Sequence, residues 1–199
     1  MVTGIILAGG RSSRMGRDKA LLPVDGQMLI ELVIKRLRPC VERLLVVAHP
    51  ANAPHFTSLP VDAVLTDFYP GHGPLMGIYT GLMAADTPLS LVVPCDMPWI
   101  KRRLIARLVS SCQMGMELAA GRHPTEGVQP FPLACRASAC RTIGRLLDRG
   151  ERSLQALLRQ PGAHVSLIED PALWPCFTNV NTLADYANLH TAKLDTSRP

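Results

Sequence analysis

The sequence GIILAGGRSSRMGRDK, residues 4–19, decides which fold this chain is expected to have. It begins with an apolar run, Gly4 to Leu7, which predicts a buried β-strand, and it continues into a glycine-rich loop. Glycines let the backbone approach a ligand closely, so that successive N–H groups can surround phosphate oxygens. Cationic side chains follow at Arg11, Arg14, Arg17 and Lys19. The stretch therefore predicts an anion-binding loop at the carboxyl end of a strand, where ligands bind in open α/β sheets.

Two common phosphate-binding motifs do not match this loop. A P-loop has its lysine directly after the second glycine of G-x-x-x-x-G-K-[ST], whereas here five residues separate Gly10 from Gly16 and Lys19 lies three residues beyond. A dinucleotide fingerprint requires G-x-G-x-x-G, and the nearest stretch, residues 71–73, is followed by Gly77 one position too late. The loop therefore belongs to neither class.

The rest of the chain alternates short β-type runs with amphipathic helical patterns. This alternation is typical of a mostly parallel sheet with helices on both faces. Strands are expected at residues 4–7, 44–48, 61–65, 89–93, 117–120, 128–135 and 164–167. Helices are expected at residues 27–38, 74–85, 101–112, 139–149, 153–160 and 183–189. The predicted fold class is α/β, a three-layer Rossmann-like architecture.

Length and composition indicate a compact globular protein. A chain of 199 residues can bury a full core, so residues 1–190 are expected to form one domain and residues 191–199 a flexible tail. No apolar run approaches the roughly 20 residues that span a bilayer, which favours a cytoplasmic protein without membrane contact. The six cysteines include no C-x-x-C pair and are expected to be buried, reduced thiols. The histidines His49, His72 and His123 lack metal-ligand spacing and are expected at the surface or in loops.

The net charge of +5 favours an anionic partner. Nucleic acid is a poor candidate, because no Lys/Arg run is longer than residues 101–103 and aromatic residues, which stack on bases, make up only 5%. A phosphorylated small molecule accounts for the excess of cations equally well.

The stretch from Leu7 to Lys19 closely resembles the L-A-G-G-x-S-x-R-M-G-x-D-K signature of the molybdenum cofactor guanylyltransferases. The resemblance continues in the same order through TD at 66–67, GPLMGI at 73–78, PCDMP at 94–98 and NVNT at 179–182. It implies a sheet of the nucleotide-diphospho-sugar transferase type. It also implies transfer of GMP from GTP to the terminal phosphate of Mo-molybdopterin, giving molybdopterin guanine dinucleotide and pyrophosphate. Cytidylyl-transferring relatives usually have L-A-A-G at this point, so Gly10 favours a guanine nucleotide.

Functional residues follow from the same resemblance. The expected GTP contacts lie at strand ends and in the loop: Leu7, Ala8, Gly9, Gly10, Lys19, Asp67 and Asp96. Asp96 would hold Mg²⁺, a cation that prefers one or two carboxylates together with phosphate oxygens. Arg14 and Lys19 are expected to be catalytic together with Asp96, because their charges would stabilise the α-phosphate and the departing pyrophosphate. Asn179 and Asn181 are expected on the pterin side.

Plainer interpretations of these residues stay open. Asp96 could cap the helix that follows it, Asp67 could be a turn residue, and Asn179 and Asn181 could cap the last helix. The chain also departs from the pattern at Ala48, because some relatives carry an asparagine there that contacts GTP.

Three other activities compete with guanylyl transfer. The chain could be a cytidylyltransferase acting on the same pterin, a nucleotidyltransferase for another phosphorylated acceptor, or a non-catalytic module that delivers a nucleotide or cofactor. The partners implied by the resemblance are GTP, Mo-molybdopterin, molybdoenzyme apoproteins and other cofactor-biosynthesis proteins. Neither nucleic acid nor a membrane is among them.

Overall fold

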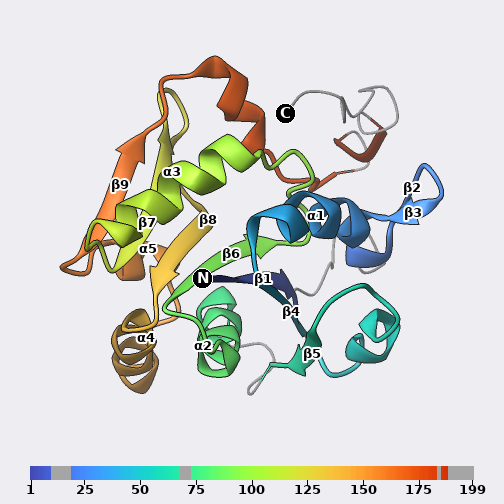
Figure 1. Cartoon of the computed structure of the whole chain (residues 1–199), viewed down its shortest axis with the longest axis horizontal. Coiled ribbons are helices and arrows are strands. Elements are labelled where there is room, and N and C mark those ends of the chain that lie inside the picture. The colour runs from blue at the N-terminus through green and yellow to red at the C-terminus, as the bar shows by residue number, and fades with distance from the viewer. Residues whose placement is uncertain (10–18, 68–72, 183–184, 188–199) are drawn as a thin grey trace.

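A seven-stranded sheet forms the centre of the computed structural model, which describes residues 1–9, 19–67, 73–182 and 185–187 (Figure 1). The strand order is β5-β4-β1-β6-β8-β7-β9. Every strand runs in the same direction except β8, which is antiparallel to both β6 and β7. The strands are β1 (Val2–Ala8), β4 (Arg43–Ala48), β5 (Ala63–Thr66), β6 (Leu89–Pro94), β7 (Leu118–His123), β8 (Gly127–Arg136) and β9 (Ala163–Leu167).

Helices cover both faces of this sheet, which confirms the predicted three-layer α/β fold. One face packs against α1 (Leu29–Leu37), α3 (Arg102–Gln113) and the 3-10 helix η4 (Pro171–Phe177). The other face packs against α2 (Pro74–Ala84), α4 (Ala139–Asp148) and α5 (Leu154–Leu158). Successive strand residues point to opposite faces, so Ile6 joins the first core and Ile5 the second. Burial on both faces explains why the strands are continuous apolar runs in the sequence.

The first predicted helix was wrong at its start. Gln27–Met28 forms β3, which pairs with β2 (Pro23–Val24) in a small hairpin, and the helix begins only at Leu29. Asp25 and Gly26 connect the two strands with φ values of 47° and 80°. An Asp-Gly pair is a strong hairpin signal because both positions of the favoured turn need positive φ. In the sequence, the apolar helical pattern that follows outweighed this turn signal, so the hairpin was not predicted.

The remaining expected elements are confirmed, with ends that differ by a few residues. The largest difference at a strand end is in β7, which continues to His123. The expected helix at 183–189 is helical at residues 185–187, and the rest of it lies outside the described residues. Short 3-10 helices were not predicted and occur at η1 (Lys19–Leu21), η2 (Arg38–Cys40), η3 (Ala53–Phe56) and η4. The domain limits and the tail stay a prediction, because residues 188–199 are not described.

His123 corrects the expectation of a surface or loop position. It is 7% exposed, at the end of β7, and its ring centre lies 4.9 Å from that of Trp174 in an edge-on contact. Its Nδ1 accepts the backbone N–H of Thr125 at 3.3 Å and of Glu126 at 3.2 Å. The ring therefore connects the β7–β8 turn to η4, the helix that leads into residues 178–182.

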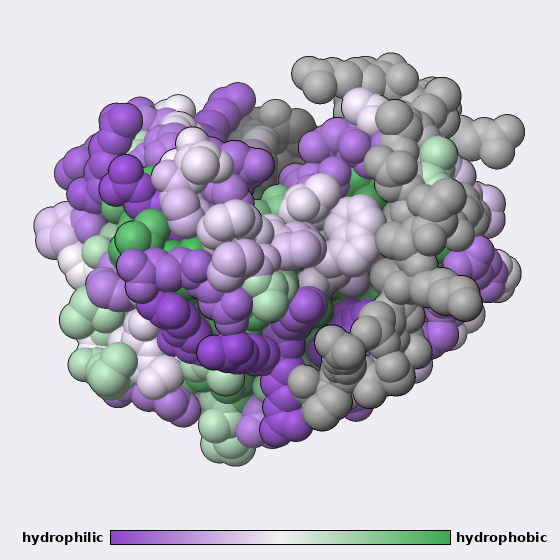
Figure 2. All heavy atoms as spheres, turned by 90° about the horizontal axis from the view of Figure 1, so that it is seen from above, coloured by the Kyte–Doolittle hydropathy of each residue, from purple (hydrophilic) through white to green (hydrophobic). Residues whose placement is uncertain are grey.

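All six cysteines are free thiols, as expected. Four of them are buried, whereas Cys40 and Cys140 are only half-buried. No helix in the described part of the chain is long and apolar enough to span a membrane. Figure 2 shows a face on which hydrophilic residues predominate and hydrophobic ones form small separate groups. Scattered apolar residues of this kind are normal on a protein surface and need no partner to cover them.

Candidate active site

The candidate site lies where four neighbouring parallel strands end. In register, Leu7 of β1 pairs with Pro94 of β6, and Ala8 pairs with Ala48 of β4. Ala48 in turn pairs with Thr66 of β5. Because the carboxyl ends of these strands lie at one edge, the residues that follow them share that edge: Gly9, His49, Asp67 and Asp96. This edge is the ligand-binding side of an open α/β sheet.

Asp96 and Lys19 meet at this edge. Asp96 follows β6 by two residues, and Lys19 opens η1 after the loop of residues 10–18. The Nζ atom of Lys19 lies 3.3 Å from Oδ2 of Asp96. Their side chains are 19% and 13% exposed, so the ion pair is largely shielded from water. The structure therefore brings together two of the three residues predicted to be catalytic.

The second carboxylate oxygen of Asp96 is the unusual feature of the site. Oδ1 is buried, and no donor in the described part of the chain reaches it. Burial raises the pKa of Asp96 above its ordinary value, while the charge of Lys19 acts in the opposite direction. A buried acceptor without a partner carries a desolvation cost. Such an oxygen is suited to a cation that arrives with a ligand.

Asn181 also contacts Lys19. Its Oδ1 accepts a hydrogen bond of 2.6 Å from Lys19 Nζ, across a sequence separation of 162 residues. The preceding residue, Val180, donates its backbone N–H to the carbonyl oxygen of Asp96 at 2.9 Å. Asn179 is half-buried, and in the described part of the chain no hydrogen bond joins it to Lys19 or Asp96. Of the two asparagines, the structure thus brings Asn181 into the cluster.

Asp67 lies at the same edge but belongs to a different set of contacts. Its backbone N–H donates to the carbonyl oxygen of Ala48 at 2.9 Å, and its Oδ1 lies 3.5 Å from the hydroxyl of Thr80 in α2. Ala48 is fully buried, so its methyl group offers no polar contact to a ligand. Leu7 is half-buried, Ala8 buried and Gly9 exposed at the end of β1.

Gly10 and Arg14 lie outside the described residues. Their assignment to GTP binding and to catalysis stays a prediction.

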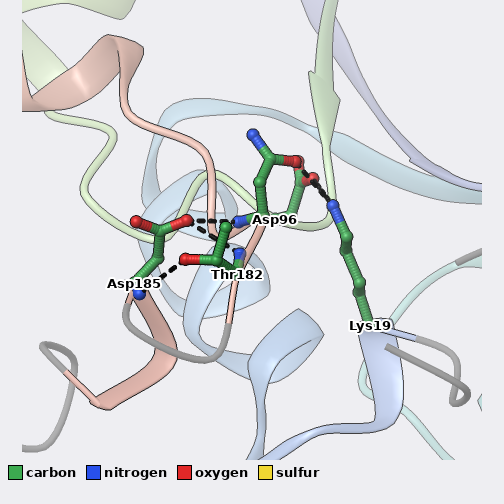
Figure 3. A network of polar contacts seen from close by, with 5 residues as sticks. Lys19, Asp96, Thr182 and Asp185 are labelled. Atoms are coloured by element: carbon green, nitrogen blue, oxygen red, sulfur yellow. Dashed lines mark hydrogen bonds and ion pairs between the residues drawn. The ribbon is translucent and has the colours of Figure 1, made fainter. Parts of the chain in front are cut away.

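Two residues near the site were not predicted. Oδ2 of Asp185 accepts the backbone N–H groups of Asn181 at 2.9 Å and Thr182 at 2.8 Å. The hydroxyl of Thr182 accepts the N–H of Asp185 at 3.1 Å in return. Figure 3 shows Asp185 and Thr182 on one side of Asp96 and Lys19 on the other. This reciprocal pair is a helix capping box, and the spacing T-x-x-D in the sequence was the signal for it.

The donor set fits a metal ion that is shared with a substrate. No group of three or more His, Cys, Asp or Glu side chains that could hold a metal occurs among the described residues. A cation bound through Asp96 would therefore need other oxygen ligands. Mg²⁺ binds in this way, through one or two carboxylates, phosphate oxygens and water.

Solved structures share this fold. The molybdopterin-guanine dinucleotide biosynthesis protein A of Archaeoglobus fulgidus superposes with a TM-score of 0.77 and 21% identity, covering 95% of this chain and 97% of that one. A Mycobacterium tuberculosis protein in complex with manganese superposes with a TM-score of 0.72 and 18% identity, covering 96% and 98%. The family model of the MobA-like NTP transferase domain matches residues 4–165. The fold, the site and this match define the chain as a nucleotidyltransferase.

Sequence similarity narrows the class further. The molybdenum cofactor guanylyltransferase of Yersinia pseudotuberculosis is 36% identical over 187 residues, which cover 92% of this chain and 92% of that protein. The chain therefore belongs to the MobA-like NTP transferase family, within the group of the molybdenum cofactor guanylyltransferases.

Proposed function

We propose that this protein transfers GMP from GTP to the terminal phosphate of Mo-molybdopterin in a Mg²⁺-dependent reaction. An oxygen of the acceptor phosphate attacks the α-phosphorus of GTP. The bond between the α-phosphorus and the oxygen bridging to the β-phosphate breaks, and pyrophosphate leaves with that electron pair. The products are molybdopterin guanine dinucleotide and pyrophosphate. The acceptor itself is the nucleophile, so no side chain of the protein has to attack. The protein has to bind the two substrates, orient their phosphates and neutralise the negative charge of those phosphates.

The single observation that carries this proposal is the buried Asp96 carboxylate, with one oxygen on Lys19 and the other without a described partner. Asp96 would hold the metal, and the metal would supply positive charge between two phosphate groups that repel each other. The Mycobacterium tuberculosis protein that shares this fold is described as a complex with manganese.

Lys19 is the cation that the chain itself supplies. Its ammonium is held by Asp96 and Asn181, so the charge is oriented before the substrates bind. It is placed to stabilise the negative charge that grows on the α-phosphate and the pyrophosphate. A preorganised donor of this type contributes about 10² to 10³ in rate. Arg14 is proposed to add a second charge, and Asn179 and Asn181 to lie towards the pterin.

Selection of guanine is proposed to come from the loop and the ends of β1 and β5. Leu7, Ala8, Gly9, Gly10 and Asp67 are the residues that we assign to the nucleotide. Ala48 cannot replace the asparagine of some relatives, because its buried side chain has no donor or acceptor. Backbone groups and the remaining side chains at this edge must therefore distinguish the base.

The nucleotide assignment is tested by pyrophosphate release from purified protein with Mg²⁺ and Mo-molybdopterin. We expect release with GTP and much less with CTP, ATP or UTP. A preference for CTP would overturn the guanylyl assignment. Removal of divalent cations with a chelator should stop the reaction, and added Mg²⁺ should restore it.

The catalytic assignment is tested by Asp96→Ala. We expect turnover to fall by at least about 10²- to 10³-fold, the loss seen when one preorganised electrostatic group is removed. Asp62→Ala is the matched control. Asp62 also accepts hydrogen bonds from a cationic side chain, that of Arg38, and from a backbone N–H, that of Leu44, but it precedes β5 and so lies at the opposite edge of the sheet. A protein that merely delivers cofactor would keep its delivery activity in both variants.

A further inference from the structure

The bond between Lys19 and Asn181 joins two segments that rest on one small apolar cluster. We call it the hairpin cluster; its buried members are Leu22, Val24, Leu29, Leu32 and Val180. Leu22 lies directly after η1, which Lys19 opens, and Val180 lies directly before Asn181. The backbones of the two bonded residues are therefore anchored next to each other. Their side-chain contact still needs Asn181 to be held in one orientation, because Asn181 is exposed.

Asp185 supplies that restraint. Its Oδ2 accepts both the N–H of Asn181, at 2.9 Å, and the N–H of Thr182, at 2.8 Å (Figure 3). An ordinary capping box ties only the N-cap residue, which is Thr182 here. The additional bond to Asn181 reaches one residue further, to the residue whose side chain binds Lys19.

Tyr186, the residue after Asp185, fixes the position of Asp185 through its own contacts with the hairpin. Its ring packs against the hairpin cluster, and its hydroxyl donates a hydrogen bond to the carbonyl oxygen of Pro23 in β2. Its backbone N–H donates to the carbonyl oxygen of Thr182 at 3.0 Å. The turn that carries Asp185 is thus fixed to the same hairpin that follows Lys19.

We propose that Asp185 is a positioning residue of the active site, which holds Asn181 on the ammonium of Lys19 and thereby fixes Lys19 beside Asp96. Asp185 reaches the reacting groups only through Asn181 and Lys19. The inference rests on the proposed function for its catalytic consequence, but its structural half is independent of the reaction. The N–H of Asn181 is also the main reason why the pKa of Asp185 lies below its ordinary value, so the carboxylate is charged at neutral pH.

Kinetics of GMP transfer test the catalytic consequence. In Asp185→Ala we expect kcat to fall roughly 10- to 100-fold, the range that a displacement of about 1 Å produces, with the KM for GTP nearly unchanged. Asp185→Glu should recover most of kcat, because glutamate is the usual partner in a capping box. Asp62→Ala loses a comparable set of bonds at the opposite edge and should keep the kcat of the wild type.

A double-mutant cycle separates positioning from mere helix capping. If Asp185 acts through Asn181, Asp185→Ala should change kcat less than about twofold in an Asn181→Ala background, because residues that act as a unit are not additive. Equal losses in both backgrounds, or a kcat in Asp185→Ala equal to that of the wild type, would overturn the proposal.

A measurement without substrates keeps the two proposals distinguishable. In ¹⁵N NMR of the full chain, the Lys19 ammonium should give a slowly exchanging signal in the wild type and in Asp62→Ala, and lose it in Asp185→Ala and Asn181→Ala. Retention of that signal in Asp185→Ala would overturn the positioning role even in a protein without activity. Suppose instead that the wild type transfers no GMP, while the Lys19 signal is present in the wild type and lost in Asp185→Ala and Asn181→Ala. That result would overturn the proposed function alone.

Discussion

The side chain of Ile5 fills the space next to Gly81. A Cβ atom at Gly81 would lie 2.6 Å from Cγ2 of Ile5, which is closer than two carbon atoms can approach. Ile5 is fully buried in β1, and Gly81 is in α2. The helix therefore lies so close to the sheet that only a glycine fits at this crossing. Since β1 ends at the edge where the candidate site lies and α2 carries Thr80, which contacts Asp67, this crossing joins two elements that border the candidate site.

Gly81→Ala should destabilise the protein by about 1–3 kcal/mol, because the buried Ile5 and the helix would have to move apart. Gly144→Ala is the matched control in α4. Its Cβ would meet Tyr79 at 3.4 Å, an ordinary contact, and alanine in a helix is favoured over glycine by about 1 kcal/mol. Urea unfolding of both variants measures the difference. Equal destabilisation of the two variants would contradict the close crossing at Ile5.

Lys19→Met should lower kcat for GMP transfer by about 10² to 10³, because the variant keeps much of the side-chain length but loses the positive charge that we propose to act on the α-phosphate. Arg38→Met is the control, since Arg38 also forms an ion pair, at 2.6 Å to Asp62, far from the ligand edge. Steady-state kinetics with GTP measure both. A Lys19→Met enzyme with the kcat of the wild type would remove Lys19 from the catalytic residues.

Acid should weaken the fold partly through Asp62. The hydrogen bond from Arg38 is the main reason why the pKa of Asp62 lies below its ordinary value, and the N–H of Leu44 adds to it. A carboxylate with a lowered folded pKa stabilises the protein above its unfolded pKa, and this stability is lost as pH falls through the folded value. The free energy of unfolding of the wild type should therefore fall more steeply than that of Asp62→Asn between about pH 5 and pH 2. Parallel curves for the two proteins would disagree with this assignment.

The buried thiols should resist modification. Burial raises the pKa of Cys112 and Cys176 to about 11 and that of Cys135 well above its ordinary value. The thiolate is the reactive form, so roughly one in a thousand of the Cys112 and Cys176 thiols is reactive at pH 8. With an alkylating reagent and peptide mass spectrometry, half-buried Cys40 and Cys140 should be labelled first. Labelling of Cys112 as fast as Cys140 would show that α3 opens readily.

The fold class could be predicted because doubly buried parallel strands leave continuous apolar runs in the sequence, separated by helical patterns. The residues Asp96 and Lys19 could be named from their motifs, but their contact could not be predicted, because it depends on how β6 and η1 pack. The same holds for the contact of His123 with Trp174, since neither residue carries a local signal of its partner. The hairpin at Asp25 is different, because its turn signal was present and the neighbouring helical pattern outweighed it.

The 162-residue separation between Lys19 and Asn181 has a consequence for biosynthesis. A ribosome adds about 5–20 residues per second, so the partner of this lysine is made roughly 10 to 30 seconds after the lysine itself. During that interval the nascent chain already contains the loop and the first strands but lacks the amide that orients its cation. The lysine that we propose to be catalytic therefore acquires this partner only with the last part of translation.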